Sequence, residues 1–191
     1  KYSPWIYFKS NFVDLDVYYY KRKYSTIKSK KLYFRGTINS RPIIKYFPPH
    51  ILEGPSYIES ARPEQYFEDI IKYQIALAVG GVSEMCYRDV ECMALGIPFI
   101  RFEYEHKMKI PLIPNVHYIA VPRPEDLPEN KDRLGLKHHA DMLVKRYLEV
   151  VDDKEFLNFV AKNAREYYEK YLQVPNDLNN TIEYLGITDW V

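Results

Sequence analysis

Apolar residues along the chain form short runs that alternate with stretches of helical periodicity. Residues 75–79 are continuously apolar and precede two glycines, as expected for a strand covered on both faces of a parallel sheet. Residues 31–35, 98–102 and 117–121 predict further strands. Residues 42–47, 63–73 and 84–95 have the apolar spacing or the bounding Pro and Gly of helices, with Gly96 as the expected C-cap of the last.

The two ends of the chain are predominantly helical in pattern. Residues 14–28 predict a helix capped by Asp14, and residues 141–151 and 154–172 carry apolar stripes. A last short helix is expected at 177–185, whereas 48–61 lack a pattern and 122–137 predict a polar connection. The alternation predicts an α/β fold, a Rossmann-like parallel sheet flanked by helices with C-terminal helices. Residues 31–191 would form this domain, and residues 1–30 a lead-in segment.

Composition narrows the class of partner. The 191 residues are 47% hydrophobic and 28% charged, enough for one domain with a real core. With 27 basic and 26 acidic side chains, the net charge of +1 creates no broad field for nucleic acid or an anionic membrane. The sequence contains no run of 18 apolar residues, so we expect no membrane insertion of this segment. Any phosphate site must therefore be local.

The cysteines and the start of the chain indicate the cellular compartment and whether the sequence is part of a longer protein. Cys86 and Cys92 lie six residues apart in one predicted helix on nearly opposite azimuths, so we expect buried thiols and no disulfide between them. This pattern and the lack of a signal-peptide core favour the cytoplasm. Because the chain begins without Met, we expect a domain of a longer protein, with a neighbouring domain. The adjacent His138 and His139 do not predict a metal site.

Ligands of doubly wound sheets bind outside the carboxyl ends of the strands, and two turns are expected there. In the first, Gly81, Val82 and Ser83 lead from a strand into a helix, whose free N–H groups favour an anion such as pyrophosphate. The alternative is a plain connection. Gly-x-Gly-x-x-Gly is absent, which argues against an NAD enzyme.

The helix after this turn carries charged residues at helical spacing. Glu84, Arg88 and Glu91 share one face, with Tyr87 close by. Arg88 would clamp a diphosphate and Glu91 would accept the ribose hydroxyls. The alternative is an exposed ion-pair ladder, worth about 0.3–0.5 kcal/mol per pair. The small residues at 93–98 favour function, since they bring this face against the sheet and its crevice.

The second turn contains Arg35, Gly36 and Thr37, with Arg41 four residues further on. Fixed arginines and backbone donors can neutralise the charge that develops on a leaving nucleoside diphosphate without a metal. The alternative is a strand-terminal arginine that is simply solvated.

The order of these motifs resembles the protein O-glucosyltransferase and capsule-associated xylosyltransferase family over residues 31–172. The motifs are Phe34-Arg35-Gly36-Thr37 with Arg41, Tyr73, Gly80-Gly81-Val82, Tyr87-Arg88, Pro111 to Pro114 and His117-Tyr118-Ile119. The resemblance implies a GT-B-type fold and metal-independent, inverting sugar transfer from a UDP-sugar, with no cofactor, and makes an endomembrane lumen an alternative compartment. It carries Arg35, Gly36, Thr37, Ser83 and Arg88 over as UDP contacts. Residues 91–98 resemble the broader two-domain glycosyltransferases, in which such a Glu holds the donor ribose.

The sequence departs from the family at the general base. The family takes an Asp from an N-terminal half that this chain lacks, and Asp14, Asp16, His50 and Glu84 are the local substitutes. Asp14 is our choice because it precedes the donor domain, with a helix cap as the alternative role. The expected function is transfer of a sugar to a glycan or glycoprotein hydroxyl. The alternative is a non-catalytic nucleotide-sugar-binding or scaffolding domain.

Overall fold

The protein is a three-layer α/β domain built on one parallel sheet. The computed structural model describes residues 14–25, 28–36, 38–53, 62–80, 85–105, 110–124 and 133–173. The strands are ordered β2-β1-β3-β4-β5, and every neighbouring pair is parallel. They are β1 (Ser29–Tyr33), β2 (Leu52–Glu53), β3 (Tyr73–Leu77), β4 (Phe99–Phe102) and β5 (Ile119–Val121). The predicted α/β class with a Rossmann-like parallel sheet is confirmed.

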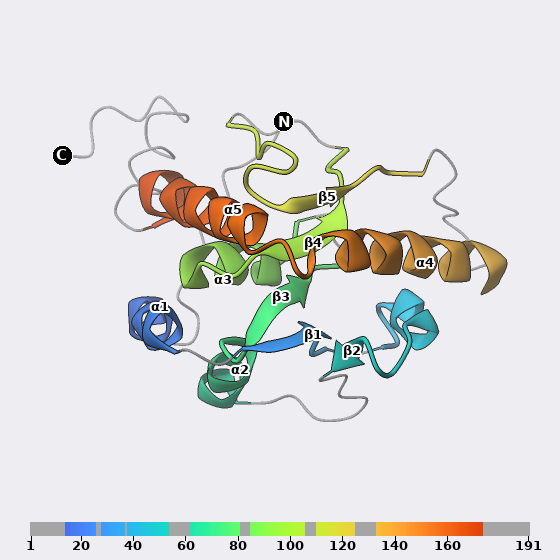
Figure 1. The fold of residues 1–191 in the computed structure, drawn as a ribbon, viewed down its shortest axis with the longest axis horizontal. Coiled ribbons are helices and arrows are strands. Elements are labelled where there is room, and N and C mark those ends of the chain that lie inside the picture. Colours follow the sequence, from blue (N-terminus) through green and yellow to red (C-terminus); the bar gives the residue numbers. More distant parts are fainter. Residues whose placement is uncertain are drawn as a thin grey trace, which may run out of the picture.

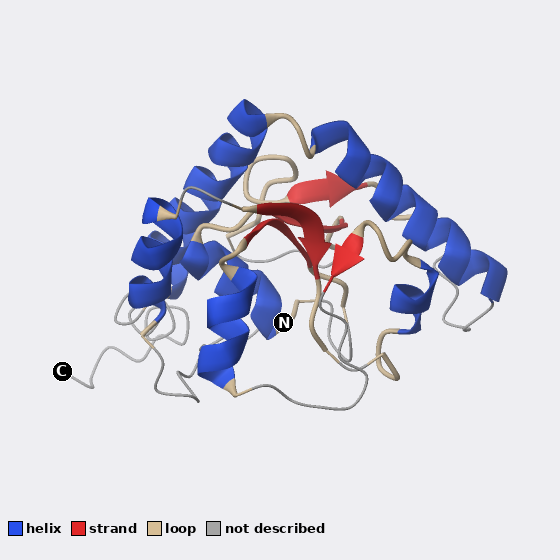
Figure 2. Cartoon of the chain, turned by 60° about the horizontal axis from the view of Figure 1, so that its bottom comes forward, coloured by secondary structure: helices blue, strands red, loops and turns tan. Residues whose placement is uncertain are grey.

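Helices cover both faces of the sheet (Figure 1). They are α1 (Leu15–Tyr24), the 3-10 helix η1 (Pro42–Tyr46), α2 (Pro63–Ile70), α3 (Tyr87–Leu95), α4 (Arg133–Val150), α5 (Lys154–Tyr167) and the π-helical turn η2 (Tyr168–Leu172). One face packs against α1, α2, α3 and η2, and the other against η1 and α4. Figure 2 shows α4 and α5 diverging from the turn between them. The first half of α5 packs in the same cluster as α4, through Leu157 and Val160, and its second half packs in the opposite cluster, through Ala164 and Tyr167.

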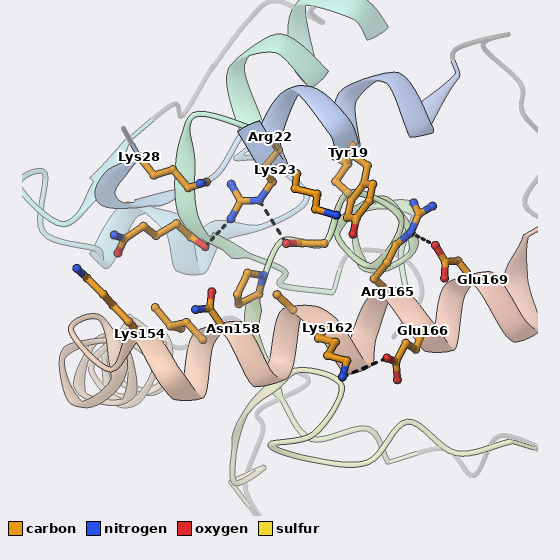
Figure 3. Close-up of a pocket in the computed structure, with 16 residues that line it drawn as sticks. Tyr19, Arg22, Lys23, Lys28, Lys154, Asn158, Lys162, Arg165, Glu166 and Glu169 are labelled. Atoms are coloured by element: carbon orange, nitrogen blue, oxygen red, sulfur yellow. Dashed lines mark hydrogen bonds and ion pairs between the residues drawn. The ribbon is translucent and has the colours of Figure 1, made fainter. Parts of the chain in front are cut away.

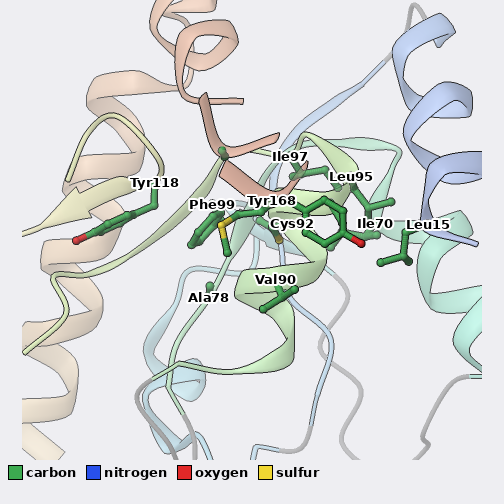
Figure 4. Packing of buried hydrophobic residues seen from close by; sticks show 14 of the residues in the cluster. Leu15, Ile70, Ala78, Val90, Cys92, Leu95, Ile97, Phe99, Tyr118 and Tyr168 are labelled. Atoms are coloured by element: carbon green, nitrogen blue, oxygen red, sulfur yellow. The ribbon is translucent and has the colours of Figure 1, made fainter. Parts of the chain in front are cut away.

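The alternating side chains of β1 and β3 divide the core into two clusters. Leu32, Ile75 and Leu77 pack on the side of η1 and α4. Tyr33 and Ala76 face α2 and α3, whose apolar side chains meet those of α1 and β4 in Figure 4. Each fully buried aliphatic or aromatic side chain contributes about 1.5–3 kcal/mol. The two clusters therefore join the strands to the helices on each face of the sheet.

Several predicted boundaries were wrong. The strand β2 lies in the segment that lacked a pattern, because two residues are too few to show alternation. Residues 42–46 form a 3-10 helix. Helix α1 ends at Tyr24, not at residue 28, and α4 begins at Arg133, inside the predicted polar connection. At the start of α4 both Leu134 and Lys137 are exposed, so this turn of the helix has no buried apolar stripe to predict it. The helix predicted at 177–185 lies outside the described residues. None of the described helices combines the length and apolar character of a membrane span.

Gly96 ends α3 as predicted. Its φ is 60°, in the left-handed region, and its N–H donates to the carbonyl of Met93 at 3.2 Å. A Cβ at this position would lie 3.0 Å from Cε2 of Tyr19 in α1. A side chain at Gly96 would therefore meet both backbone strain and a packed ring.

We expect Gly96→Ala to lower the free energy of unfolding by about 1–2 kcal/mol, the cost of a left-handed conformation for an L-residue. Urea denaturation measures this change. The matched control is Gly135→Ala in the helical backbone of α4, which should be neutral or stabilising. Equal effects of the two substitutions would show that Gly96 is not needed for the cap.

Candidate functional site

The carboxyl ends of β1 and β3 form the best candidate for a ligand site. The chain passes from β1 outward to β2, then returns across the sheet to β3 and proceeds to β4 and β5 on the other side. Such a reversal opens a crevice between the loops that leave the two central strands. The residues after β1, the residues after β3 and the start of α3 meet there. Gly36, Arg41 and Arg88, all predicted from the sequence, lie in this region.

Arg88 is the most unusual residue of this edge. Its side chain is buried, with only 9% of the residue exposed, and its guanidinium stacks 4.6 Å from the centre of the Phe34 ring. Nη2 donates to the carbonyl oxygen of Arg35. Nε and Nη1 are buried without a hydrogen-bond partner in the described part of the chain. Arg88 is therefore not part of an exposed ladder, and among the described residues the Tyr66 hydroxyl is a further polar group that interacts with its guanidinium.

Gly36 lets the turn after β1 pass beside this guanidinium. A Cβ on Gly36 would lie 3.5 Å from Nη2 of Arg88 and 3.2 Å from Cζ of Phe34. A larger side chain at this position would thus come too close to both the Phe34 ring and the Arg88 guanidinium. The close approach of backbone and guanidinium explains why a small residue suits this position.

Arg41 adds a second cation to the edge. Its Nε donates at 3.2 Å to the carbonyl of Val79, two residues after β3, and its Nη1 donates to Ser40 Oγ at 3.1 Å. Burial lowers the pKa of Arg41, and the positive charge of Arg88 lowers it further. The two guanidinium groups are thus close enough to repel each other. An anion between them would remove this repulsion.

Glu91 lies one helical turn beyond Arg88, near Tyr66 of α2. Burial by itself lowers the pKa of Arg88, but Tyr66, Cys86 and Glu91 raise it, and the net shift is upward. Burial raises the pKa of Tyr66, and the Glu91 carboxylate raises it further. The neighbouring Arg88 guanidinium interacts with the buried Tyr66 hydroxyl and acts in the opposite direction, lowering the pKa of Tyr66. Arg88, Glu91 and Tyr66 therefore form a polar group between α3 and α2.

The Arg35 side chain takes a different direction from the one expected. Its Nη1 lies 2.9 Å from Oδ2 of Asp69, and Lys72 binds the other oxygen of the same carboxylate. Asp69 is in the last turn of α2, which leads into the amino end of β3. The guanidinium of Arg35 is thus turned along the sheet toward α2, and only its carbonyl oxygen contacts Arg88.

A buried ion pair lies beneath the edge, and the sequence analysis missed it. Oδ2 of Asp89, a fully buried residue of α3, lies 2.9 Å from Nη1 of Arg101 in β4. The same oxygen accepts from the N–H of Cys86 at 2.6 Å, and the Arg101 guanidinium stacks 3.4 Å from the Tyr104 ring centre. This pair fixes the start of α3 against the sheet. The signal was an arginine within the apolar run at 98–102.

The remaining predicted residues are placed only in part. Thr37, Gly81, Val82, Ser83 and Glu84 lie outside the described residues. Tyr87 is described, and the residue is 59% exposed at the start of α3. Asp14 is exposed and caps α1, where Oδ1 accepts from the N–H of Asp16 at 3.0 Å. Within the described ranges, no three His, Cys, Asp or Glu side chains are grouped to hold a metal ion.

Both cysteines are free, but only Cys92 is buried as predicted, whereas Cys86 is partly exposed. Cys86 precedes α3 rather than lying inside it, and Cys92 is fully buried within the helix. Burial raises the pKa of Cys86 to about 11 and that of Cys92 well above its usual value. Both therefore remain protonated thiols at neutral pH, which makes them poor nucleophiles.

Neither a protein-family model nor a curated protein matches this chain. The functional assignment therefore depends on the geometry of the site and on the motifs of the sequence.

Proposed function

We propose that this chain is the donor-binding domain of an inverting, metal-independent glycosyltransferase of GT-B type that uses a UDP-sugar. The observation that carries the proposal is the buried guanidinium of Arg88. Among the described residues two of its donors make no hydrogen bond of good geometry, its charge lowers the pKa of Arg41, and it stands at the carboxyl edge where the strand order reverses.

A diphosphate would supply hydrogen-bond acceptors for Arg88 and negative charge between Arg88 and Arg41. A buried donor without a partner costs about 1–3 kcal/mol, so the two donors of Arg88 are destabilising in the absence of an acceptor. Phosphate oxygens accept such bonds in pairs, and their negative charge separates the two guanidinium groups. During sugar transfer, negative charge grows on the leaving diphosphate, and Arg88 and Arg41 would stabilise it.

The nucleoside has suitable partners on the same helix. Glu91, one turn from Arg88, would accept the ribose hydroxyls as the sequence predicts. The exposed ring of Tyr87 offers a face on which the base can stack. Arg35 would contribute mainly through its backbone, because its guanidinium already pairs with Asp69.

A non-catalytic nucleotide-sugar-binding or scaffolding domain is the second candidate. The observation that favours it is the role of Asp14, the expected base, as the cap of α1. UDP should bind in both cases, whereas release of sugar from a UDP-sugar onto a glycan or protein acceptor occurs only in the first. Turnover assays with a panel of UDP-sugars and acceptors test the choice. UDP binding without any turnover would support the second candidate.

Asp14 can be tested as a base separately from its role as a cap. Asn caps a helix as well as Asp, so Asp14→Asn should keep the stability of the chain, while Asp14→Ala should lose about 1 kcal/mol in denaturant unfolding. A transfer rate reduced by about 100-fold or more in stable Asp14→Asn would identify the base. An unchanged rate would remove Asp14 from the mechanism.

A further inference from the structure

A second basic site lies at the amino edge of the sheet, opposite the edge that holds Arg88. A groove of about 820 Å³ runs between α1 and α5 (Figure 3). Lys28 precedes β1, Gln74 is the second residue of β3 and Pro98 precedes β4, so the groove opens at the amino ends of the three central strands. It therefore cannot be an extension of the proposed UDP site.

The charges of the groove are unevenly paired. Lys162 and Arg165 of α5 have carboxylate partners, Glu166 at 3.8 Å and Glu169 at 2.6 Å respectively. Four other cations line the groove without an ion pair among the described residues, namely Arg22, Lys23, Lys28 and Lys154. The groove thus has an excess of positive charge at the end remote from Glu169.

Arg22 holds a fixed charge in the floor of the groove. It is 7% exposed and donates to the carbonyls of Ile71, Tyr73, Gln74 and Gly96. Burial lowers the pKa of Arg22 to about 10, so it remains protonated at neutral pH. The carbonyls satisfy its donors and leave the charge without a counter-ion.

Lys28 brings a second cation beside this one. It is partly buried and its ammonium donates to the carbonyl of Ser25 at 2.9 Å. Burial lowers the pKa of Lys28, and the charge of Arg22 lowers it further. Two neighbouring cations in a partly dry groove destabilise each other until an anion binds.

Helix stability explains only part of this arrangement. Lys23 lies in the last turn of α1, where the helix dipole favours a cation. Lys154 is the first residue of α5, where the dipole disfavours one. Lys28 lies outside any helix. The convergence of these side chains on one groove therefore needs a different explanation.

We infer that this groove binds a small, soluble anion with two or more phosphate groups. Lysine ammonium groups suit phosphate as compact point charges, and several of them match a diphosphate better than a single carboxylate. The site is concave and enclosed by two helices, and Glu166 and Glu169 stand at one end, which suits a small ligand better than a flat anionic membrane.

The test is a titration of the full chain with inorganic pyrophosphate, followed through backbone amide chemical shifts. We expect saturable shifts at residues 22–25, 28, 74 and 154–158, apart from any shifts at the carboxyl edge. The double variant Lys28→Gln/Lys154→Gln should weaken the groove site about tenfold or more. Lys145→Gln, an exposed lysine of α4, is the control and should change neither site.

The outcomes separate this inference from the proposed function. Arg88→Gln should remove the shifts at the carboxyl edge and leave those in the groove. The inference is wrong if pyrophosphate does not shift the groove residues, or if the double variant binds as tightly as the parent. Binding only to vesicles of anionic phospholipid, lost in the same variant, would also overturn it in favour of a lipid headgroup. If the double variant is unstable, Lys154→Gln alone, at an exposed position, provides the comparison.

Discussion

Replacing Arg88 with glutamine is expected to abolish detectable UDP binding while the domain stays folded. The variant loses two charge-assisted donors to the diphosphate, about 3–6 kcal/mol together, which corresponds to a loss in affinity of about 100-fold or more. It also loses the contact with the Phe34 ring and a bond to the Arg35 carbonyl. Losing these two contacts lowers the stability of the fold, but removing the buried charge of Arg88 offsets part of this loss.

Calorimetric titration with UDP measures the affinity, and thermal unfolding of the same sample verifies the fold. The matched control is Arg146→Gln, which removes an arginine of α4 that pairs with Glu149 on the surface. It should bind UDP like the parent. An Arg88→Gln protein that binds UDP within about threefold of the parent would show that this side chain is structural only.

The largest effect on stability is expected for Asp89→Asn. This change leaves the buried Arg101 without its counter-ion, and breaking a buried pair on one side costs about 3–5 kcal/mol. The N–H of Cys86 at the start of α3 also loses a charged acceptor. We therefore expect a large fall in the urea midpoint and weaker UDP binding, since Arg88 directly precedes Asp89 in the same helical turn.

The matched control is Asp141→Asn, which breaks the exposed pair with Lys137 on α4 and should cost less than about 1 kcal/mol. The double variant Asp89→Leu/Arg101→Met removes both buried charges and should recover much of the loss. Similar costs for Asp89→Asn and Asp141→Asn would contradict the role given to the buried pair.

The pattern of apolar residues and glycines predicted those elements of the fold that are determined by residues close together in the sequence. The apolar run at 75–79 correctly predicted a buried strand, although β3 spans Tyr73–Leu77, and Gly96 was correctly predicted as a cap. Burial on both faces and a left-handed cap leave a signal within a few residues. The short β2 left none, since its place beside β1 depends on pairing between Leu32 and Leu52.

The candidate site was predictable in its residue types and less so in its geometry. The sequence placed Gly36, Arg41 and Arg88 at the carboxyl edge, because the ends of parallel strands meet there. It could not show that Arg35 turns to Asp69, a residue 34 positions away. The ion pair between Asp89 and Arg101 also joins two elements, α3 and β4. The spacing of apolar residues within one element cannot predict a contact with another element.

The most direct test of the central claim is a titration of the full chain with UDP, followed through backbone amide chemical shifts. The proposed site predicts saturable shifts at residues 35, 36, 41, 80 and 87–91, around the buried guanidinium of Arg88. These shifts should disappear in Arg88→Gln. Millimolar UDP that leaves these residues unshifted would contradict a nucleotide-sugar site at this edge of the sheet.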